Sequence, residues 1–246
     1  LLITTGARNK SFDLEAAAEY GTTVCCTGGV GSPTSELAWG LIISLMRDIP
    51  GQLESMRKGG WQTKPGFNLA NKTLGIVGLG HLGARMAKVG IAFDMNVEAW
   101  SQNLTDERAH EIGVVKVSKE QLFAQADIIT IHYGMSERSR GMIGAKELAA
   151  MKKSAYIVNT SRAPIIDQDA LYLALETNQI AGAGLDVYMS EPLAATDRFR
   201  KLANVILTPH IGYVTTENHE KHYADVVENI MQFLDDEPIR VLAAPD

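Results

Sequence analysis

The chain has 246 residues, of which 46% are hydrophobic and 21% charged, and its formal net charge is −6 at pH 7. This composition is ordinary for a globular protein, and the length allows one large α/β domain or two smaller ones. Because charges of both signs are interspersed and form no basic stripe, we expect neither nucleic acid nor a membrane surface as a partner.

The two cysteines indicate the redox state of the cellular compartment. Cys25 and Cys26 are the only cysteines of the chain, and neighbouring cysteines rarely form a disulfide without strain. Free thiols are typical of a reducing compartment. No apolar run has membrane-spanning length and no cleavable signal is visible, so we expect a cytoplasmic protein. The first residues, LLITTG, resemble a strand already under way, and we expect the sequence to begin inside a longer protein.

The first long helix is predicted in SPTSELAWGLIISLMR, with Ser32 as its cap and Pro33 in the first helical position. Residues 37–46 are apolar except for Gly40 and Ser44. A helix that is apolar nearly all round must be buried on several sides. We therefore expect part of this helix to lie at a subunit interface, which predicts a homodimer.

From Leu74 onward, apolar strands alternate with helices. This rhythm favours a doubly wound, parallel-sheet domain of the Rossmann type, with both faces of the sheet covered. Strands are expected at 74–78, 95–100, 114–117, 127–133, 154–161, 181–187 and 204–209, and helices at 81–93, 105–112, 118–126, 146–151 and 167–177. An amphipathic helix at 217–236 follows the sheet.

The stretch IVGLGHLGARMA, residues 76–87, has the spacing of a dinucleotide-binding loop. A lone GxGxxG is weak evidence, but this one follows a strand and opens a helix, which is the context that the motif requires. Gly78 would form the tight turn, Gly80 would let the backbone approach a pyrophosphate, and Gly83 would let helix and strand pack closely. The pyrophosphate would lie at the helix N-terminus.

The end of the second strand bears on the choice between NAD and NADP. An acidic side chain about 20 residues after the glycines usually binds the ribose of NAD, but Ser101 stands there and Glu98 comes too early. No carboxylate would repel a 2′-phosphate, although the nearest arginine, Arg108, lies in the next helix. We predict NAD or NADP, with a slight preference for NADP.

Three charged or titratable residues follow predicted strands. Arg162 lies in NTSRAPI, Glu191 in LDVYMSEPL and His210 in TPHIG. In open α/β sheets the site lies beyond the carboxyl ends of the strands. Each residue alone has an ordinary structural explanation, but together they offer a cation, an acid and an orienting carboxylate. Reduction of a 2-oxo acid needs this set.

Six stretches in a fixed order give the chain its resemblance to a known family. These are TSELAWGLIISLMR, KTLGIVGLGHLG, ADIITIH, MKKSAYIVNTSRAPIID, AGAGLDVYMSEPL and NVILTPHIGYVT. They are similar to motifs of the D-isomer-specific 2-hydroxyacid dehydrogenases. The resemblance implies that Arg162, Glu191 and His210 are catalytic, with Arg162 holding the substrate carboxylate, His210 exchanging a proton and Glu191 orienting the imidazole.

The resemblance also implies a set of cofactor contacts and a domain plan. Residues 1–33 would be part of a smaller α/β substrate domain, 34–213 the dinucleotide-binding domain, and 214–246 a helix that returns to the substrate domain. Arg8 would face the substrate together with Arg162 and His210. The expected cofactor-binding residues are Gly78, Gly80, His81, Leu82, Gly83, Ser101, His132, Thr160, Ser161, Arg162, Asp186, His210 and Gly212. We expect no metal.

Departures from the family pattern leave alternatives open. Ala163 stands where the family usually has glycine, and Tyr133 where it often has proline. The substrate would be glyoxylate or hydroxypyruvate, or, in another relative, phosphoglycerate or formate. The alternative function is a catalytically weak, dinucleotide-sensing binding protein of the corepressor kind. His110, His219 and His222 lie on predicted helices, where we expect them to be solvated.

Overall fold

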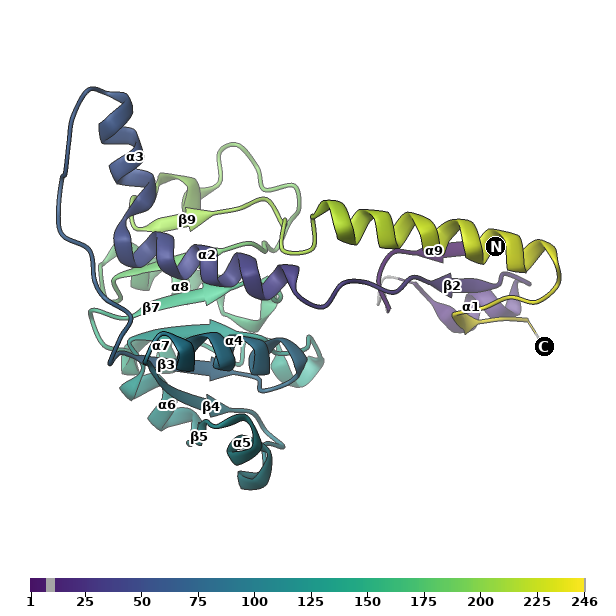
Figure 1. Cartoon of the computed structure of the whole chain (residues 1–246), viewed down its shortest axis with the longest axis horizontal. Helices are drawn as coiled ribbons and strands as arrows, with labels where there is room; N and C mark the ends of the chain where they lie inside the picture. Colours follow the sequence, from purple (N-terminus) through teal and green to yellow (C-terminus); the bar gives the residue numbers. More distant parts are fainter. Residues whose placement is uncertain (8–11, 246) are drawn as a thin grey trace. The chain divides into compact units, whose positions relative to one another are not determined.

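The structure is a computed structural model in which residues 1–7 and 12–245 are described. These residues form two compact units (Figure 1). Unit 1 consists of Leu1–Pro33 and Tyr213–Asp246, and unit 2 consists of Thr34–Gly212. The chain therefore passes between the units twice, once after Pro33 and once after Gly212.

Unit 2 is built on a seven-stranded sheet with the order β5-β4-β3-β6-β7-β8-β9, in which every pair of neighbours is parallel. The strand order reverses between β3 and β6, so the carboxyl ends of these two strands flank a topological switch point, where ligands bind in such sheets. The strands are β3 (Thr73–Val77), β4 (Asn96–Trp100), β5 (Val115–Lys116), β6 (Ile128–Ile131), β7 (Tyr156–Asn159), β8 (Gly182–Leu185) and β9 (Val205–Leu207).

Helices cover both faces of this sheet, as predicted for a doubly wound fold. One buried cluster holds Phe123, Leu148 and Leu171, which lie on the helices of one face. The other holds Ile42 and Met86, from the helices of the opposite face. The first face carries α6 (Lys119–Gln125), α7 (Ala145–Ala150) and α8 (Gln168–Glu176); the second carries α2 (Pro33–Arg47), α4 (His81–Ala92) and α5 (Asp106–Ile112). The predicted Rossmann-type sheet is confirmed.

The ends of these helices follow local capping chemistry. The Ser118 side chain accepts a hydrogen bond from the backbone of Gln121, whose side chain binds the backbone N–H of Ser118 in return. Asp167 accepts from the N–H groups of Asp169 and Ala170 at the start of α8. Each such cap stabilises a helix by about 1 kcal/mol. Short 3-10 turns lie in the connections: η1 (Glu137–Ser139), η2 (Ala163–Ile165) and η3 (Arg198–Lys201).

Most of the apolar surface of α2 is buried within unit 2 itself. Trp39, Leu41 and Ile42 are at most 6% exposed, and Leu41 packs over Gly184 of the sheet. The apolar run of residues 37–46 therefore reflects mainly the burial of α2 against the sheet of the same unit. A further helix, α3 (Ile49–Arg57), which the sequence did not predict, follows at once and exposes Ile49, Leu53 and Met56.

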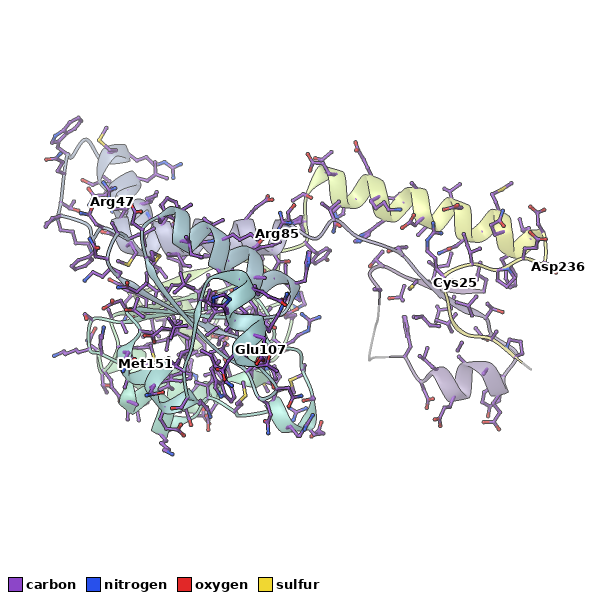
Figure 2. The ribbon with its side chains drawn as sticks, turned by 60° about the horizontal axis from the view of Figure 1, so that its bottom comes forward. Cys25, Arg47, Arg85, Glu107, Met151 and Asp236 are labelled. Carbon is purple, nitrogen blue, oxygen red and sulfur yellow. The ribbon has the colours of Figure 1, made fainter. Side chains whose placement is uncertain are left out.

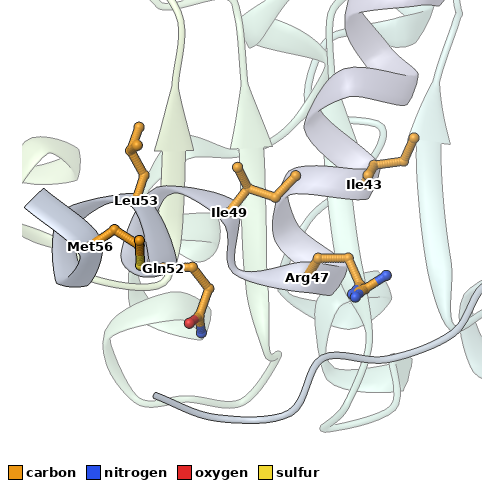
Figure 3. A pocket seen from close by; sticks show the side chains of 6 residues that line it. All are labelled: Ile43, Arg47, Ile49, Gln52, Leu53 and Met56. Carbon is orange, nitrogen blue, oxygen red and sulfur yellow. The ribbon is translucent and has the colours of Figure 1, made fainter. Parts of the chain in front are cut away.

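The junction of α2 and α3 carries a solvent-facing hollow of about 440 Å³ (Figure 3). Four of its lining side chains are apolar, and Arg47 and Gln52 supply polar groups. The apolar ones are Ile43, Ile49, Leu53 and Met56. The hollow lies on the outside of unit 2.

Figure 2 shows the side chains of the structure: Arg85 on α4 and Glu107 on α5 are exposed, whereas Met151 after α7 is buried in the core.

Unit 1 holds a three-stranded sheet with the order β1-β2-β10. β1 (Leu2–Thr4) is parallel to β2 (Val24–Cys26), and β10 (Val241–Ala243) is antiparallel to β2. Two helices, α1 (Leu14–Glu19) and α9 (Thr216–Leu234), complete this unit. None of the helices in the described part of the chain is long and apolar enough to cross a membrane.

Helix α9 buries polar side chains and exposes apolar ones. Its buried residues are Asn218, His222, Asp225 and Asn229. Its exposed apolar residues are Tyr223, Val227, Ile230, Met231 and Leu234. The expectation that His222 is solvated was wrong, since the residue is only 6% exposed. The helix is amphipathic as predicted, but its polar face is the buried one.

Backbone hydrogen bonds explain this arrangement. Asn229 donates to the carbonyl of Cys26, and Asp225 accepts from the N–H of Gly28. Asn218 accepts from the N–H of Val30. The polar side chains of α9 thus provide hydrogen-bond partners for backbone groups of residues 26–30.

Candidate active site

The glycine loop joins β3 to α4 at the carboxyl edge of the sheet. Gly78 has φ +99°, and a Cβ there would lie 2.5 Å from the carbonyl oxygen of His132. Its N–H donates to the carbonyl of Trp100 on β4. Only glycine combines this backbone angle with such a close approach, so this turn requires glycine at position 78.

The next two glycines shape the start of α4. A Cβ on Gly83 would collide with the carbonyl oxygen of Gly78, so helix and strand come as close as glycine permits. Gly80 is the N-cap and makes no side-chain cap, and a Cβ there would meet nothing within 4 Å. The N-terminus of this 12-residue helix is thus open where a pyrophosphate would be cradled. His81 is exposed and Leu82 half-buried in its first turn.

Ser101 follows β4 next to this loop. Its carbonyl accepts the N–H of Leu104, and its side chain is partly exposed. Glu98 lies in the middle of β4, opposite Gly75 and Val115, where burial raises the pKa of its carboxyl above the ordinary range. Arg108 on α5 pairs with Glu111 at 3.1 Å.

Two buried polar atoms at the ends of β6 and β7 have no partner. They are Nδ1 of His132 and Oγ1 of Thr160, among four such side-chain atoms in the described part of the chain. Buried polar atoms in folded proteins are nearly always hydrogen-bonded, so unpartnered ones at a sheet's carboxyl edge fit a site that receives a ligand. The other ring nitrogen of His132 lies 2.8 Å from Oγ1 of Thr130. Burial lowers the pKa of His132 to about 4, so the ring is neutral at pH 7.

Arg162 lies in the loop after β7, on a segment pinned by Asn159. The Asn159 side chain accepts from the N–H of Ser161 and donates to the carbonyl of Arg162. The Ser161 hydroxyl donates to the carbonyl of Tyr133, 2.6 Å away on the loop after β6. The Arg162 side chain is exposed. Ala163, which stands where the family usually has glycine, is only 2% exposed, so its methyl group is buried within unit 2.

Asp186 follows β8 and is fully buried. Its carboxylate accepts three hydrogen bonds, from the hydroxyl of Thr208 at 2.6 Å, the N–H of Ile211 at 2.9 Å and the N–H of Gly212 at 2.8 Å. The carbonyl of Gly212 accepts from the hydroxyl of Thr34. Asp186 therefore holds the loop that carries His210.

His210 and Glu191 form a close pair. The imidazole Nδ1 lies 2.5 Å from Oε2 of Glu191, and the two side chains are 33% and 35% exposed. The other carboxylate oxygen of Glu191 accepts the N–H of Tyr188. The backbone of His210 has φ 53°, and its N–H donates to the carbonyl of Thr208. One ring nitrogen is thus engaged by a carboxylate, which fixes the orientation of the ring.

Unit 2 brings most of the predicted site residues to one edge. They follow β3, β4, β6, β7, β8 and β9, and hydrogen bonds join neighbouring loops, as between Ser161 and Tyr133 or Thr208 and Asp186. Arg8 lies outside the described residues. Three residues that hold the site were missed by the sequence analysis: Asn159, Tyr188 and Thr208. All three lie inside the quoted motifs, two or three residues before Arg162, Glu191 or His210.

Comparison with known proteins identifies the family. Residues 39–212 match the description "D-isomer specific 2-hydroxyacid dehydrogenase, NAD binding domain". The chain belongs to the D-isomer-specific 2-hydroxyacid dehydrogenase family. The resemblance stated from the six sequence motifs is confirmed.

Individual relatives differ in name and in length. The chain is 39% identical to D-3-phosphoglycerate dehydrogenase of Synechocystis sp. over 93% of this chain and 42% of that protein. It is 37% identical to glyoxylate reductase of Thermococcus litoralis over 91% of this chain and 70% of that protein. A solved structure of a putative D-3-phosphoglycerate dehydrogenase from Ralstonia solanacearum has a TM-score of 0.91 and 32% identity, covering 98% of this chain and 76% of that one. The chain spans less than half the length of the first of these dehydrogenases.

Proposed function

We propose that this member of the D-2-hydroxyacid dehydrogenase family is an oxidoreductase that interconverts a 2-oxo acid and a D-2-hydroxy acid with NAD or NADP. The observation that carries the proposal is the 2.5 Å contact between His210 and Glu191 at the sheet edge that also carries the glycine loop. An imidazole oriented by a carboxylate is a general acid or base. A dinucleotide loop at the same edge supplies the cofactor for an oxidation or reduction.

The residues present fit a nicotinamide dinucleotide. Gly78, Gly80 and Gly83 would hold the pyrophosphate against the start of α4, and Ser101 would lie by the adenosine ribose. Support comes from the open surface at Gly80 and from the unpartnered buried atoms of His132 and Thr160. When bound, the nicotinamide supplies or accepts the hydride at the substrate carbon. His81, Leu82, Ser161 and Gly212 complete the proposed cofactor contacts, and Asp186, which is fully buried, would act through the backbone of Gly212 that it holds.

His210 would move the proton. With Nδ1 engaged by Glu191, Nε2 is the nitrogen that would donate to the substrate carbonyl oxygen in reduction. In oxidation, the same nitrogen would take the hydroxyl proton. Glu191 would keep the imidazole in one orientation during both steps, because its Oε2 contacts Nδ1 of the ring. The pair therefore works in both directions.

Arg162 would hold the substrate carboxylate. Its planar guanidinium matches a carboxylate with two parallel hydrogen bonds, and its side chain is exposed at the edge where His210 lies. Among relatives, the printed names point to phosphoglycerate and glyoxylate. We propose that unit 1, with Arg8, is part of a substrate domain that selects among such acids.

A turnover assay tests the proposed function. Oxidation of NADH and NADPH is followed with glyoxylate, hydroxypyruvate and phosphohydroxypyruvate, for the unchanged chain, for Arg162→Ala and for Arg57→Ala. Arg57 is exposed on α3 and serves as the matched control. We expect turnover that Arg162→Ala lowers by ~100-fold or more, because a charge pair with substrate is lost, while Arg57→Ala is unchanged. Cofactor binding with no turnover on any acid would favour the alternative function, a dinucleotide-sensing protein.

We also propose a homodimer in the cytoplasm. Support for the dimer comes from the apolar side chains of α2 and α3 around the hollow of Figure 3, because large exposed apolar patches mark interaction surfaces. Trp61 and Phe67, on the segment after α3, are also exposed. Support for a reducing compartment comes from Cys25 and Cys26, which are free thiols.

A further inference from the structure

We propose that Tyr188 is the positioning residue of the His210–Glu191 pair, holding Glu191 through its backbone N–H and the His210 loop through its hydroxyl. This inference rests on the proposed function, because the pair has a catalytic role only if the chain reduces 2-oxo acids. Nothing in the six family motifs assigns a task to a hydroxyl at this position.

The first contact is with Glu191. The N–H of Tyr188 donates to Oε1 of Glu191 at 2.9 Å, while Oε2 of the same carboxylate contacts His210. A carboxylate with one oxygen fixed by a backbone donor can offer the other oxygen in only one direction. The backbone of Tyr188 therefore sets the direction from which Glu191 meets the imidazole.

The second contact reaches the His210 loop. The Tyr188 hydroxyl lies 2.8 Å from the carbonyl oxygen of Thr208 and 3.0 Å from that of Leu185. The Thr208 carbonyl also accepts the backbone N–H of His210, at 3.0 Å. One carbonyl thus joins the tyrosine hydroxyl to the backbone of the histidine.

These contacts close a ring. It runs from the Tyr188 N–H through the carboxylate of Glu191 to the ring of His210, and back through the His210 N–H and the Thr208 carbonyl to the Tyr188 hydroxyl. His210 has a left-handed backbone with φ 53°, which is uncommon for a residue with a side chain. Such a conformation persists only when surrounding contacts determine it, and the hydroxyl of Tyr188 is one of these contacts.

The hydroxyl keeps its proton over the working pH range. Burial raises the pKa of Tyr188 to about 12, and the negative charges of Asp186 and Glu191 add to this effect. Its donated hydrogen bond is therefore present wherever the enzyme is assayed. The contact acts as a fixed part of the loop and not as a titrating switch.

The test removes one oxygen atom. Tyr188→Phe keeps the ring and the backbone N–H but loses the bond to Thr208. Tyr172→Phe is the matched control, since the Tyr172 hydroxyl also donates a single bond, to Glu176 on the exposed side of α8. Both variants lose one hydroxyl from unit 2 and keep the aromatic ring, so Tyr172→Phe controls for the loss of a hydroxyl as such.

The first readout is the imidazole of His210, observed by ¹⁵N NMR in protein labelled at histidine and assigned by its loss in His210→Gln. We expect the Nδ1 resonance of His210 to shift in Tyr188→Phe toward its position in Glu191→Gln, and to stay in place in Tyr172→Phe. A Tyr188→Phe spectrum that superposes on that of the unchanged chain overturns the proposal. This readout needs no turnover.

The second readout is kinetic. In Tyr188→Phe we expect kcat to fall about tenfold, a part of the contribution that a general acid makes, with the Kd for NADH unchanged. Equal kcat values in Tyr188→Phe and Tyr172→Phe count against the proposal. If the unchanged chain reduces no 2-oxo acid, the proposed function fails, whereas the NMR comparison still decides whether Tyr188 positions His210.

Discussion

Single residues at the carboxyl edge of unit 2 divide into those that would touch ligands and those that hold them. Arg162 is exposed, whereas Asn159 beneath it is 1% exposed and binds both sides of its loop. Likewise His210 is one-third exposed, whereas Asp186 is fully buried and its carboxylate accepts hydrogen bonds from the Thr208–Gly212 loop. Precision at the reacting atoms therefore depends on buried polar residues one contact away.

Ser101 carries a prediction on cofactor choice. Replacing it with aspartate places a carboxylate where a ribose 2′-OH would be accepted and a 2′-phosphate repelled. We expect Ser101→Asp to favour NADH over NADPH by about tenfold more than the unchanged chain does, one tenfold step being about 1.4 kcal/mol. Fluorescence titration with both cofactors measures this, with Gln102→Asp, at the exposed neighbouring position, as control. The same ratio in both variants would place the ribose elsewhere.

His132 carries a prediction on pH. Burial lowers its pKa from 6.5 to about 4, so between these values the unfolded chain binds a proton that the folded chain does not. The free energy of unfolding must therefore decrease as pH falls from 6.5 toward 4, by on the order of 3 kcal/mol. Urea unfolding across this range should show a smaller decrease in His132→Asn. Parallel curves for the two proteins would mean that the ring is not held neutral.

At the scale of elements, the helices, strands and turns that the sequence predicted are those whose formation depends on local chemistry. Central strands of unit 2 such as β6 and β8 are continuous buried runs, and Ser118 and Asp167 mark helix starts by caps that the structure shows. The turn at Gly78 was predicted because only glycine suits it. Of the site, the motifs gave Arg162, Glu191 and His210 as candidates, and the structure brings the last two into contact.

Other elements could not be predicted because distant contacts determine them. Helix α3 is an exception: Ile49, Leu53 and Met56 have helical spacing, and the sequence analysis missed this short helix, whose apolar side chains are exposed. Strand β10 exists only through its pairing with β2, about 200 residues earlier in the chain. In the sequence, the polar face of α9 resembles a solvent-exposed face. It is buried because its side chains bind backbone groups of residues 26–30, which lie far away in the chain. For the same reason Tyr188 was missed, because its partner Thr208 lies about 20 residues later in the chain, just after β9.

Helix α9 carries the prediction at this scale. Asn229 is fully buried and binds both Cys26 and Arg240, so Asn229→Ala leaves buried polar groups without partners and should destabilise the helix by ~1–3 kcal/mol. Val227 is 60% exposed on the opposite face, and Val227→Ala should change stability by less than about 0.5 kcal/mol. Hydrogen exchange of α9 peptides compares the two. A larger loss in Val227→Ala would mean that the helix is packed the other way round.

On the scale of the whole molecule, the outer surface of unit 2 predicts self-association. Leu53 is 47% exposed beside the hollow at α2 and α3, and a charge there would have to be buried in a dimer interface. We expect light scattering to give a dimer mass for the unchanged chain and a monomer mass for Leu53→Glu. Leu173→Glu, at a 57% exposed position on α8, should remain dimeric. A monomer mass for the unchanged chain contradicts the homodimer.

The most direct test of the central claim, a dinucleotide on the glycine loop, is a titration of NADH and NADPH against three proteins. These are the unchanged chain, Gly80→Ala and Gly40→Ala; at both positions a Cβ meets nothing within 4 Å, so both variants should fold. We predict binding by the unchanged chain and by Gly40→Ala, and a Kd at least ~10-fold higher in Gly80→Ala, because the added methyl lies where the backbone must approach the pyrophosphate. Equal affinity in all three, or no binding by the unchanged chain, would contradict the cofactor site described for this edge of the sheet.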